Sequence, residues 1–544
     1  MQFSAAELFG RVACVAILAC PLALNAASTE SQSCEALSAL KLKDTTIISA
    51  SPVAAGEFEI PANVTERSNS SVFKSLPAFC RVTAEIKPTQ DSDIKLEVWL
   101  PATGWNGRYV SHGNGGFAGS IIYASLANGV KEGYAVAATD TGHSGNLTDG
   151  SWALGHPEKI KDFGYRGIHE MTVKAKAILH AYYGKAQQYS YFSSCSNGGR
   201  QGLMEAQRFP EDYDGIIAGA PANFFTHLLV ANVWNMQALQ NSSASYIPPS
   251  RISAINDAVL AACDAQDGVN DGIVNDPSAC HFDPAILLCK SADSNCLTAP
   301  QVAALKKIYA GPKSSKGEQV YPGLVPGGEK GFGGWAAWIT GSAPGKSLNA
   351  AFATNFFSNM VFDKSAWDFK TFNFDADVKI TDDKQAANLN ATNADLKNFK
   401  SRGGKLIIYH GWNDAAISPL NTIDYYNSVE KNLGPRDVNA FMRLYMAPGM
   451  QHCGGGPGPD SFGAYESSAG STDPEHSMFS ALEQWMEKGM APDRIIATKL
   501  NDPTDPAKGI RMTRPLCPYP QVAKYKGPGD SNDQANFVCA VPKR

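Results

Sequence analysis

The sequence has no strong excess of charge of either sign and, after its first residues, no long apolar run. Lys and Arg number 47 and Asp and Glu number 52, so the formal net charge is only −5 over 544 residues. Sparse, nearly balanced charge provides no basic surface for nucleic acid or for an anionic membrane. No later segment is long and apolar enough to cross a bilayer. No cluster of His and Cys has the spacing of a zinc site. We therefore expect neither nucleic acid nor a membrane as a partner.

The single long apolar run lies near the beginning of the chain. It covers residues 12–24, follows Arg11 and is succeeded by Ala26-Ala27-Ser28. The run is short for a membrane span and ends in small residues, which is typical of a signal peptide. We expect residues 1–26 to be a signal peptide, cleaved near Ala26 or Ala27, and the mature protein to be secreted into the extracellular space.

Cysteines and sequons fit this expectation. Of twelve cysteines, ten lie beyond the apolar run, and an even number behind a signal peptide favours an oxidised set of five disulfides. Four of the expected pairs are Cys34–Cys80, Cys263–Cys280, Cys289–Cys296 and Cys517–Cys539. Sequons for N-glycosylation, which also arise by chance, begin at Asn63, Asn69, Asn146, Asn241 and Asn390. The mature chain is thus expected to be a disulfide-bonded glycoprotein.

Short strand patterns alternate with helical ones over much of the chain. Strands are predicted at 95–100, 107–112, 134–140, 188–192, 214–220, 404–411 and 441–446, and helices at 164–183 and 477–488. This alternation favours an α/β fold with a parallel sheet covered on both faces. A last strand at 494–498 is expected to complete the sheet.

The stretch 191–202 is predicted to turn sharply from a strand into a helix. It reads Tyr-Phe-Ser-Ser-Cys-Ser-Asn-Gly-Gly-Arg-Gln-Gly, with Ser196 at the break. A serine on such a turn, with small neighbours, is the geometry of a nucleophile elbow. The usual G-x-S-x-G pattern is present except that Ser194 replaces the first glycine. By itself the pentapeptide is equally compatible with an ordinary Ser/Gly-rich loop.

Two further residues give this serine chemical partners. A serine hydroxyl needs a general base, and the base needs an orienting carboxylate. α/β-Hydrolases supply them in the order Ser, Asp, His, each after a strand. Ser196, Asp414 and His452 have this order and each follows a predicted strand. We therefore predict the α/β-hydrolase fold with these three residues as the catalytic set.

Competing candidates fit this pattern less well. His410 lies within a predicted strand, and His169 and His180 lie on a predicted helix, where a structural histidine is the simpler interpretation. Asp424, the competing carboxylate, is predicted to be helical.

Cys195 and Cys453 are the immediate sequence neighbours of Ser196 and His452. If the nucleophile and the base touch, these cysteines must be close enough to form a disulfide. The bridge would close a loop of about 258 residues, for which the chain-entropy model gives roughly 5 kcal/mol. The alternative is that the two cysteines pair elsewhere.

Two glycine-containing loops complete the candidate site. The glycine-rich loop 113–116 follows an early strand, where serine hydrolases place a backbone N–H group of the oxyanion hole. The segment 264–273 carries three carboxylates interleaved with glycines, and hard oxygen ligands on a tight loop suit Ca²⁺. Its spacing is not that of an EF-hand, and a solvated acidic turn is the alternative.

The length suggests two domains. Residues 221–395 are rich in loops and aromatic side chains, which is typical of a lid inserted after the nucleophile helix. We predict that the α/β-hydrolase domain consists of residues 27–220 and 396–544, and that the lid domain at 221–395 carries the calcium loop. Most lid aromatics are expected to form its own core, with one or two lining an apolar acyl pocket.

Several motifs resemble those of the tannase and feruloyl esterase family over nearly the whole mature chain. They are Cys-Ser-Asn-Gly-Gly-Arg-Gln-Gly at 195–202, Arg-Phe-Pro at 208–210, Tyr-Asp-Gly-Ile-Ile-Ala-Gly at 213–219, Gly-Trp-Asn-Asp at 411–414, Ile-Ser-Pro at 417–419 and Gln-His-Cys at 451–453. Members commonly have glycine before the Cys-Ser pair, where this chain has Ser194.

The resemblance implies a role for each candidate residue. Ser196 would be the nucleophile, His452 the base and Asp414 its orienting carboxylate, with Cys195 bridged to Cys453. Backbone N–H groups of Asn197 and of a glycine at or near Gly115 would form the oxyanion hole. A structural Ca²⁺ would be held by Asp264, Asp267, Val269, Asp271 and Ile273.

We expect a serine esterase that releases hydroxycinnamic acids such as ferulate, through an acyl-enzyme, from small aromatic esters or feruloylated plant cell-wall polysaccharide such as xylan. Tannase activity on galloyl esters is the close alternative, and hydrolysis of a terephthalate half-ester is compatible with the same resemblance. From another class, a non-catalytic, calcium-stabilised binding protein would use the same scaffold, although the intact Ser, Asp and His argue against it.

Overall fold

The structure is a computed structural model that describes residues 31–61, 71–290, 295–364, 366–464 and 473–542. The predicted signal peptide and the sequons at Asn63 and Asn69 lie outside these residues. Within the described ranges, no helix combines the length and the apolar character that crossing a membrane requires.

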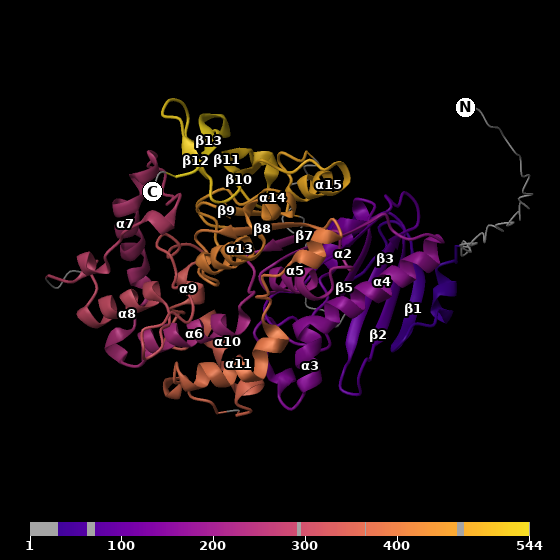
Figure 1. Cartoon of the computed structure of the whole chain (residues 1–544), viewed down its shortest axis with the longest axis horizontal. Helices are drawn as coiled ribbons and strands as arrows, with labels where there is room; N and C mark the ends of the chain where they lie inside the picture. Colours follow the sequence, from indigo (N-terminus) through magenta and orange to yellow (C-terminus); the bar gives the residue numbers. More distant parts are fainter. Residues whose placement is uncertain (1–30, 62–70, 291–294, 365, 465–472, 543–544) are drawn as a thin grey trace, which may run out of the picture.

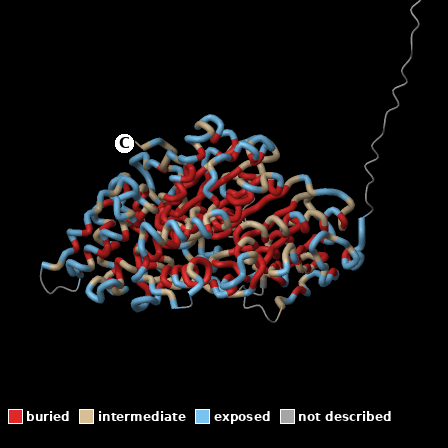
Figure 2. Tube along the Cα trace, turned by 60° about the horizontal axis from the view of Figure 1, so that its bottom comes forward, coloured by how far each residue is buried: buried red, intermediate tan, exposed pale blue. Residues whose placement is uncertain are grey.

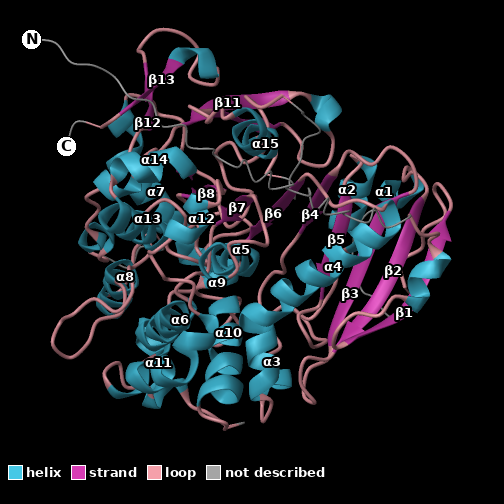
Figure 3. Ribbon diagram, turned by 45° about the vertical axis from the view of Figure 1, so that its right-hand side comes forward, coloured by secondary structure: helices cyan, strands magenta, loops and turns pink. Residues whose placement is uncertain are grey.

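A nine-stranded mixed sheet runs through the molecule (Figures 1 and 3). Its strands are β1 (Thr45–Val53), β2 (Phe79–Ile86), β3 (Ile94–Pro101), β4 (Arg108–Ser111), β5 (Ala135–Thr139), β6 (Tyr189–Cys195), β7 (Gly215–Gly219), β8 (Lys405–Gly411) and β9 (Met442–Ala447). Their spatial order is β1-β2-β3-β5-β4-β6-β7-β8-β9, so that β4 and β5 exchange places. Strands β4 to β9 run parallel, whereas β1, β2 and β3 pair antiparallel. The carboxyl ends of the parallel strands therefore meet at one edge.

Successive side chains of the central strands enter two different cores. Tyr191 packs on one face of the sheet and Phe192 on the other, and Ile407 and Ile408 divide in the same way. The alternation follows from the period of two along a strand. Because both faces are apolar, both must be covered, and Figure 2 shows the buried residues gathered in the interior.

Helices cover each face of this sheet. On one face lie α4 (Gly167–Tyr183), α5 (Asn197–Arg208) and α13 (Pro419–Leu433), and on the other α2 (Tyr123–Lys131) and α15 (Met478–Lys488). The remaining helices are α1 (Ser71–Lys74), α3 (Pro157–Lys161), α6 (Phe225–Gln240), α7 (Ile252–Cys263), α8 (Ala299–Ala310), α9 (Trp335–Trp338), α10 (Leu348–Phe356), α11 (Ala376–Leu389), α12 (Lys397–Ser401) and α14 (Pro435–Phe441). A largely parallel sheet between two helical layers, with a sharp turn after β6, is the α/β-hydrolase fold, as predicted.

The segment between β7 and β8 contributes no strand to the large sheet among its described residues. Its helices α6 to α11 gather beside the sheet (Figure 1). Their aromatic core is not closed on itself, because Phe117 from the first part of the chain packs against Phe225 and Phe352, with ring centroids 6.2 and 5.2 Å apart. Most of these aromatics pack among themselves, as expected, since the ring of Phe357 contacts those of Phe356, Trp367 and Phe372. The same core also includes residues from the first part of the chain. The domain boundaries at 220 and 395 stay a prediction.

The prediction that residues 494–498 complete the central sheet is wrong. This strand, β10 (Ile495–Leu500), pairs with β11 (Ile510–Leu516) in a separate two-stranded sheet, and β12 (Val522–Tyr525) pairs with β13 (Phe537–Ala540). The edge of β9 is instead covered by a proline-containing segment, in which Tyr519 donates its N–H to the carbonyl oxygen of Leu444 at 2.8 Å. β10 pairs instead with β11, the strand that follows it directly in sequence.

Five disulfides connect the described cysteines. They are Cys34–Cys80, Cys195–Cys453, Cys263–Cys280, Cys289–Cys296 and Cys517–Cys539, which are the pairs expected from the sequence.

Candidate active site

Ser196 occupies the sharp turn between β6 and α5. Its backbone has φ 66° and ψ −126°, a conformation that non-glycine residues rarely adopt and that costs about 1–3 kcal/mol. Three hydrogen bonds fix it: the Ser196 N–H donates to Gly219 at 2.9 Å, and its carbonyl accepts from Arg200 and Ala222, each at 3.1 Å. The turn therefore holds the serine side chain at the carboxyl edge of the sheet.

Two glycines let α5 approach the sheet behind this serine. A Cβ at Gly198 would lie 1.9 Å from Oγ of Ser194, and one at Gly199 would lie 2.2 Å from the carbonyl oxygen of Gly219. A Cβ atom cannot be accommodated at either distance, so both positions require glycine.

Ser196, His452 and Asp414 form one hydrogen-bonded chain. Nε2 of His452 lies 2.8 Å from Oγ of Ser196, and Nδ1 lies 2.7 Å from Oδ2 of Asp414. The side chain of Asp414 is fully buried, while that of His452 is 12% exposed. With Nδ1–H donating to the carboxylate, Nε2 is free to accept the serine proton, the arrangement that activates a serine hydroxyl.

The surroundings of Asp414 keep its carboxylate ionised. Burial alone would raise its pKa, but the charge of His452 and hydrogen bonds from His410 and His452 hold the pKa of Asp414 well below its usual range. Its other oxygen accepts backbone N–H bonds from Ala416 at 2.8 Å and Ile417 at 3.0 Å. A permanently charged, fully oriented carboxylate results.

His410, set aside in the sequence analysis, is part of this network. It is fully buried, and its Nε2 faces Oδ2 of Asp414 at 3.1 Å and the carbonyl oxygen of Ile417 at 3.2 Å. Since both neighbours only accept, Nε2 must carry a proton. Nδ1 lies 2.7 Å from the hydroxyl of Thr422. The sequence signal that was available is the spacing of four residues between His410 and Asp414 across the end of β8.

The loop after β4 lies beside Ser196. Gly115 and Asn197 both line the cavity at this serine. The loop is tied to α5 because Asn114 donates its backbone N–H to Oε1 of Gln201 at 2.9 Å, and Nδ2 of Asn197 donates to the carbonyl of Asn114 at 3.2 Å. A Cβ at Gly113 would lie 2.3 Å from the same Oε1, so only glycine permits this approach.

A buried arginine holds the first turn of α5, which sequence reasoning missed. Arg200 is fully buried and donates from Nε to Oδ1 of Asn197 at 2.8 Å. Its other nitrogens donate to the carbonyls of Phe163, Gly164 and Leu389 at 2.8 to 3.2 Å. Burial lowers its pKa to about 9. The side chain thus connects the helix that begins at the serine with the end of α11.

A largely apolar cavity of about 450 Å³ opens at the serine. Trp338 and Phe352 stack with ring centroids 6.2 Å apart, and Trp338 meets the His452 ring edge-on at 5.3 Å. Phe225, Leu228, Leu229, Ile417 and Ile122 add apolar surface, and Asn128, Asn232, Asn349 and Ser125 add polar groups. The described lining residues include no Lys, Arg, Asp or Glu. One or two aromatics of the inserted segment were expected to line a pocket, and three do so: Phe225, Trp338 and Phe352.

A second, larger cavity of about 890 Å³ shares Trp338 and His452 with the first. Its wall includes Lys330, the fully exposed Phe332 and the glycines at 454–456. The two cavities therefore flank the imidazole of His452.

The predicted calcium loop follows α7 directly. Asp264 accepts backbone N–H bonds from Asp271 and Gly272, and Asp267 accepts one from Val269 at 2.9 Å. Oδ2 of Asp267 is buried without a hydrogen-bond partner, which is the kind of atom a cation would satisfy. Asp271 accepts from Ile273 through one oxygen, and its other oxygen pairs with the buried Arg514 at 2.7 Å. The carboxylates fit a hard cation, with Arg514 offsetting part of their charge.

This geometry is compatible with what is known of similar proteins. Residues 80–540 match the family described as tannase and feruloyl esterase. An uncharacterized esterase of Xanthomonas campestris is 44% identical, covering 96% of this chain and 93% of its own. A mono(2-hydroxyethyl) terephthalate hydrolase of Piscinibacter sakaiensis is 35% identical, covering 86% of each chain. The crystal structure of feruloyl esterase B from Aspergillus oryzae superposes with a TM-score of 0.85 at 30% identity, covering 93% of this chain and 99% of that one.

The fold and these relatives define the class first: the protein is a carboxylic ester hydrolase. Within that class the chain belongs to the tannase and feruloyl esterase family.

Proposed function

We propose that the protein is a secreted serine esterase that hydrolyses esters of hydroxycinnamic acids such as ferulate. The observation that carries this is the apolar cavity at Ser196, which is bounded by aromatic rings and by uncharged amide groups. A flat aromatic acid with one or two ring substituents matches such a cavity, since most of its surface is apolar and its hydroxyl can find an amide partner.

The reaction would proceed through an acyl-enzyme. His452 takes the proton of Ser196 as Oγ attacks the ester carbonyl, and the same proton passes to the leaving alcohol oxygen. Backbone N–H groups of Asn197 and Gly115 would stabilise the oxyanion. Water, deprotonated by His452, then attacks the acyl carbonyl. The C–O bond to Ser196 breaks, His452 returns the proton to Oγ of Ser196, and the acid leaves.

The choice of acyl group rests on charge. A terephthalate half-ester presents a carboxylate at the far end of its ring, and a buried carboxylate needs a cationic or multiply donating partner. Among the described residues around the cavity none is Lys or Arg, which favours a neutral acyl group. Galloyl esters are also neutral, so tannase activity remains the second candidate, favoured by the family itself.

The larger cavity beyond His452 supports a bulky alcohol. Its exposed Phe332 offers an aromatic face of the kind that sugars stack on. We propose that the alcohol portion, such as a feruloylated plant cell-wall polysaccharide of the xylan type, occupies this side.

Secretion and calcium binding belong to the same proposal. The apolar run at 12–24 would be removed as a signal peptide, and the sequons at Asn146 and Asn241, both exposed, are available for glycosylation. Ca²⁺ would be held by Asp264, Asp267 and Asp271, with carbonyl oxygens of Val269 and Ile273, and its role would be structural.

The test is a set of initial rates on methyl ferulate, methyl caffeate and methyl gallate, with Ser196→Ala as the control. Turnover of ferulate or caffeate that falls by about 10⁴-fold or more in the variant supports the proposal. Turnover of gallate alone makes the enzyme a tannase. Absence of turnover, together with no labelling of Ser196 by a fluorophosphonate, would favour the non-catalytic binding protein.

A further inference from the structure

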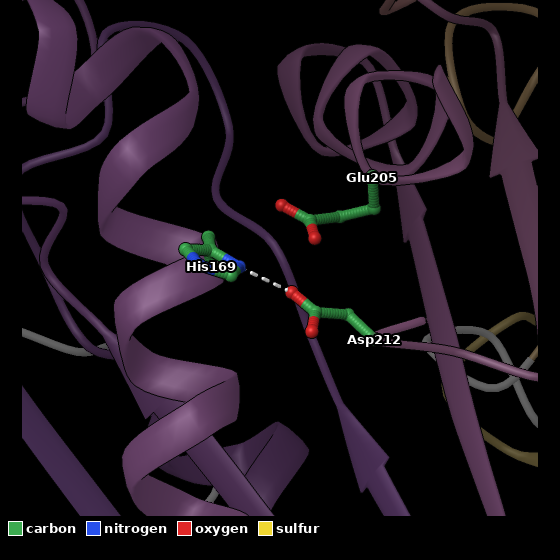
Figure 4. A group of neighbouring side chains, drawn as sticks. All are labelled: His169, Glu205 and Asp212. Carbon is green, nitrogen blue, oxygen red and sulfur yellow. Dashed lines mark hydrogen bonds and ion pairs between the residues drawn. The ribbon is translucent and has the colours of Figure 1, made fainter. Parts of the chain in front are cut away.

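Three ionisable side chains meet on the face of the sheet covered by α4 and α5. Figure 4 shows His169 on α4, Glu205 on α5 and Asp212 in the loop that follows, all directed toward one another. One ligand atom from each lies within 4.8 Å of the other two, and no other group of His, Cys, Asp and Glu in the described part of the chain gathers so closely. His169 lies 43 residues before Asp212 in the sequence and on a different helix from Glu205, which is why no motif revealed the group.

Glu205 has no partner for its charge. It is 1% exposed, and neither of its carboxylate oxygens has a hydrogen-bond partner. In Figure 4 the carboxylate points toward Asp212 and His169. Leaving a buried carboxylate unpaired costs several kcal/mol, so the site either holds a proton there or holds a cation.

The neighbouring charged groups do not neutralise the buried carboxylate of Glu205. Asp212 is buried beside it and accepts from Nδ1 of His169 at 2.6 Å. Lys176 attracts the Glu205 carboxylate, but its Nζ donates to the backbone carbonyls of Asp212 and Glu211. Arg402 repels Lys176, so its charge lowers the pKa of that lysine. Burial and the charge of Asp212 raise the pKa of Glu205 well above its usual range.

We propose that His169, Glu205 and Asp212 bind a divalent transition-metal ion, for which Zn²⁺ is the best match. One imidazole nitrogen and two carboxylates suit Zn²⁺ better than Ca²⁺ or Mg²⁺, which prefer oxygen ligands alone. The two negative charges of the carboxylates neutralise the ion, and water would complete a four-coordinate shell.

The separations between the ligand atoms are close to those of a tetrahedral zinc site. Tetrahedral bonds of about 2.1 Å place neighbouring ligand atoms about 3.4 Å apart. The present separation of 2.6 Å between Nδ1 of His169 and Oδ2 of Asp212 must therefore open by roughly 0.8 Å. The His169 side chain is 25% exposed, which gives the ion a path of entry.

The ion would connect the C-terminal end of α5 to α4. Glu205 lies in the last turn of α5, the helix that begins next to Ser196, and His169 fixes α4 beside it. The site is structural: none of its three residues lines the catalytic cavity.

The experiment is zinc retention by the full mature protein, kept in saturating Ca²⁺ so that the acidic loop at 264–273 is filled. Protein stripped with a chelator, then dialysed free of it, is loaded with ZnCl₂ and desalted, and bound zinc is measured by mass spectrometry. The variants are Glu205→Gln and His169→Gln. The matched control is His156→Gln, which removes the exposed His156–Asp91 pair without touching the cluster.

Wild type and His156→Gln are expected to retain about one more zinc per chain than Glu205→Gln and His169→Gln. Their Tm should rise by about 2 °C or more with ZnCl₂, and that of Glu205→Gln should not. Co²⁺ in place of Zn²⁺ should give visible absorption bands that Glu205→Gln lacks.

Equal zinc retention in all four proteins overturns the proposal. So does a Glu205→Gln protein that is more stable than wild type while neither responds to zinc, since Glu205 would then be a protonated carboxyl. Far-UV circular dichroism confirms that each variant is folded.

Discussion

Cys195 and Cys453 are joined by a disulfide that brings their Cα atoms to 6.0 Å, although 258 residues separate them. One is the residue before Ser196 and the other the residue after His452, and the serine and imidazole meet at 2.8 Å. The covalent bond therefore fixes the loop of His452 against the turn of Ser196, independently of packing elsewhere.

Replacing both cysteines by alanine should show how much this disulfide contributes to stability and how much to the positioning of His452. The chain-entropy model gives an upper bound of about 5–6 kcal/mol of stability for so long a loop. We expect Tm to fall by several degrees and kcat on methyl ferulate to fall by about tenfold or more below the new Tm, because the His452 loop is no longer held. The control is the Cys517→Ala, Cys539→Ala protein, which opens a disulfide with a sequence separation of only 22 residues. It should keep kcat. Equal kcat in both double variants would show that packing alone positions His452.

The sequence predicted the residues of this site better than it predicted their support. Order along the chain and position after strands were sufficient for Ser196, Asp414 and His452, because the parallel strands of this fold end at one edge. Support by Arg200 and His410 could not be read in the same way. Arg200 acts through contacts with segments that are distant in sequence. His410 faces Asp414 from only four residues away, but a histidine within a buried strand is equally compatible with a structural side chain.

The same limit explains the strand that was placed in the wrong sheet. Residues 495–500 have the composition of a strand whichever partner they take, and a partner is chosen by tertiary packing. It also explains the aromatic core of the inserted segment, because rings such as Phe117 and Phe225 are distant in sequence and adjacent in space.

His410 is expected to be a positioning residue for Asp414. Removing its side chain in His410→Ala deletes the donor at 3.1 Å from the carboxylate and leaves a buried void. We expect kcat to fall by about 10- to 100-fold with KM nearly unchanged, since substrate contacts are intact. His410→Gln, whose amide nitrogen can reach the same acceptor, should restore much of kcat. A purely structural role would lower stability in both variants without this recovery of kcat by Gln.

Asp140 is expected to make stability depend on pH. It is 5% exposed at the end of β5, and burial raises its pKa to about 7 despite backbone N–H bonds from Gly142 and Lys95. In the unfolded chain the value is about 3.9. The folded state therefore binds the proton more tightly. Between about pH 4 and 7 the free energy of unfolding falls as pH rises, and above pH 7 the full penalty remains, with an upper bound of about 4 kcal/mol.

Asp140→Asn keeps the acceptor oxygen and removes the charge. Denaturant unfolding should show the variant to be more stable than wild type at pH 8 to 9, with a difference that shrinks toward zero near pH 4. A difference that is constant with pH would mean that the charge of Asp140 is not responsible.

Asn349 is expected to recognise a ring hydroxyl of the substrate. It is 2% exposed, lines the cavity at Ser196, and its Oδ1 is buried without a hydrogen-bond partner among the described residues. A phenolic O–H of ferulate would donate to it, and such a bond contributes about 1–2 kcal/mol. Asn349→Leu should therefore lower kcat/KM for methyl ferulate by about 5- to 30-fold and leave methyl cinnamate, which has no ring hydroxyl, nearly unchanged. Phe352→Leu is the control and should lower both rates alike. If Asn349→Leu also affects the two esters equally, it acts through packing.

Removal of calcium should destabilise the protein through the acidic loop at 264–273. Asp267 leaves one buried carboxylate oxygen without a partner, and burial raises its pKa, the charges of Asp271 and Asp264 adding to the effect. A bound cation would reverse that penalty, so a chelator should lower the Tm of wild type by several degrees, and added CaCl₂ should restore it. Asp267→Asn should start at the lower Tm, and added CaCl₂ should not raise it. Asp283→Asn, which alters an exposed carboxylate outside the loop, should behave as wild type.

Because the loop is covalently closed by Cys263–Cys280, the effect should remain local, and kcat measured well below Tm should change little on chelation. A rise of Tm with CaCl₂ that persists in Asp267→Asn would place the responsible calcium ion elsewhere in the chain.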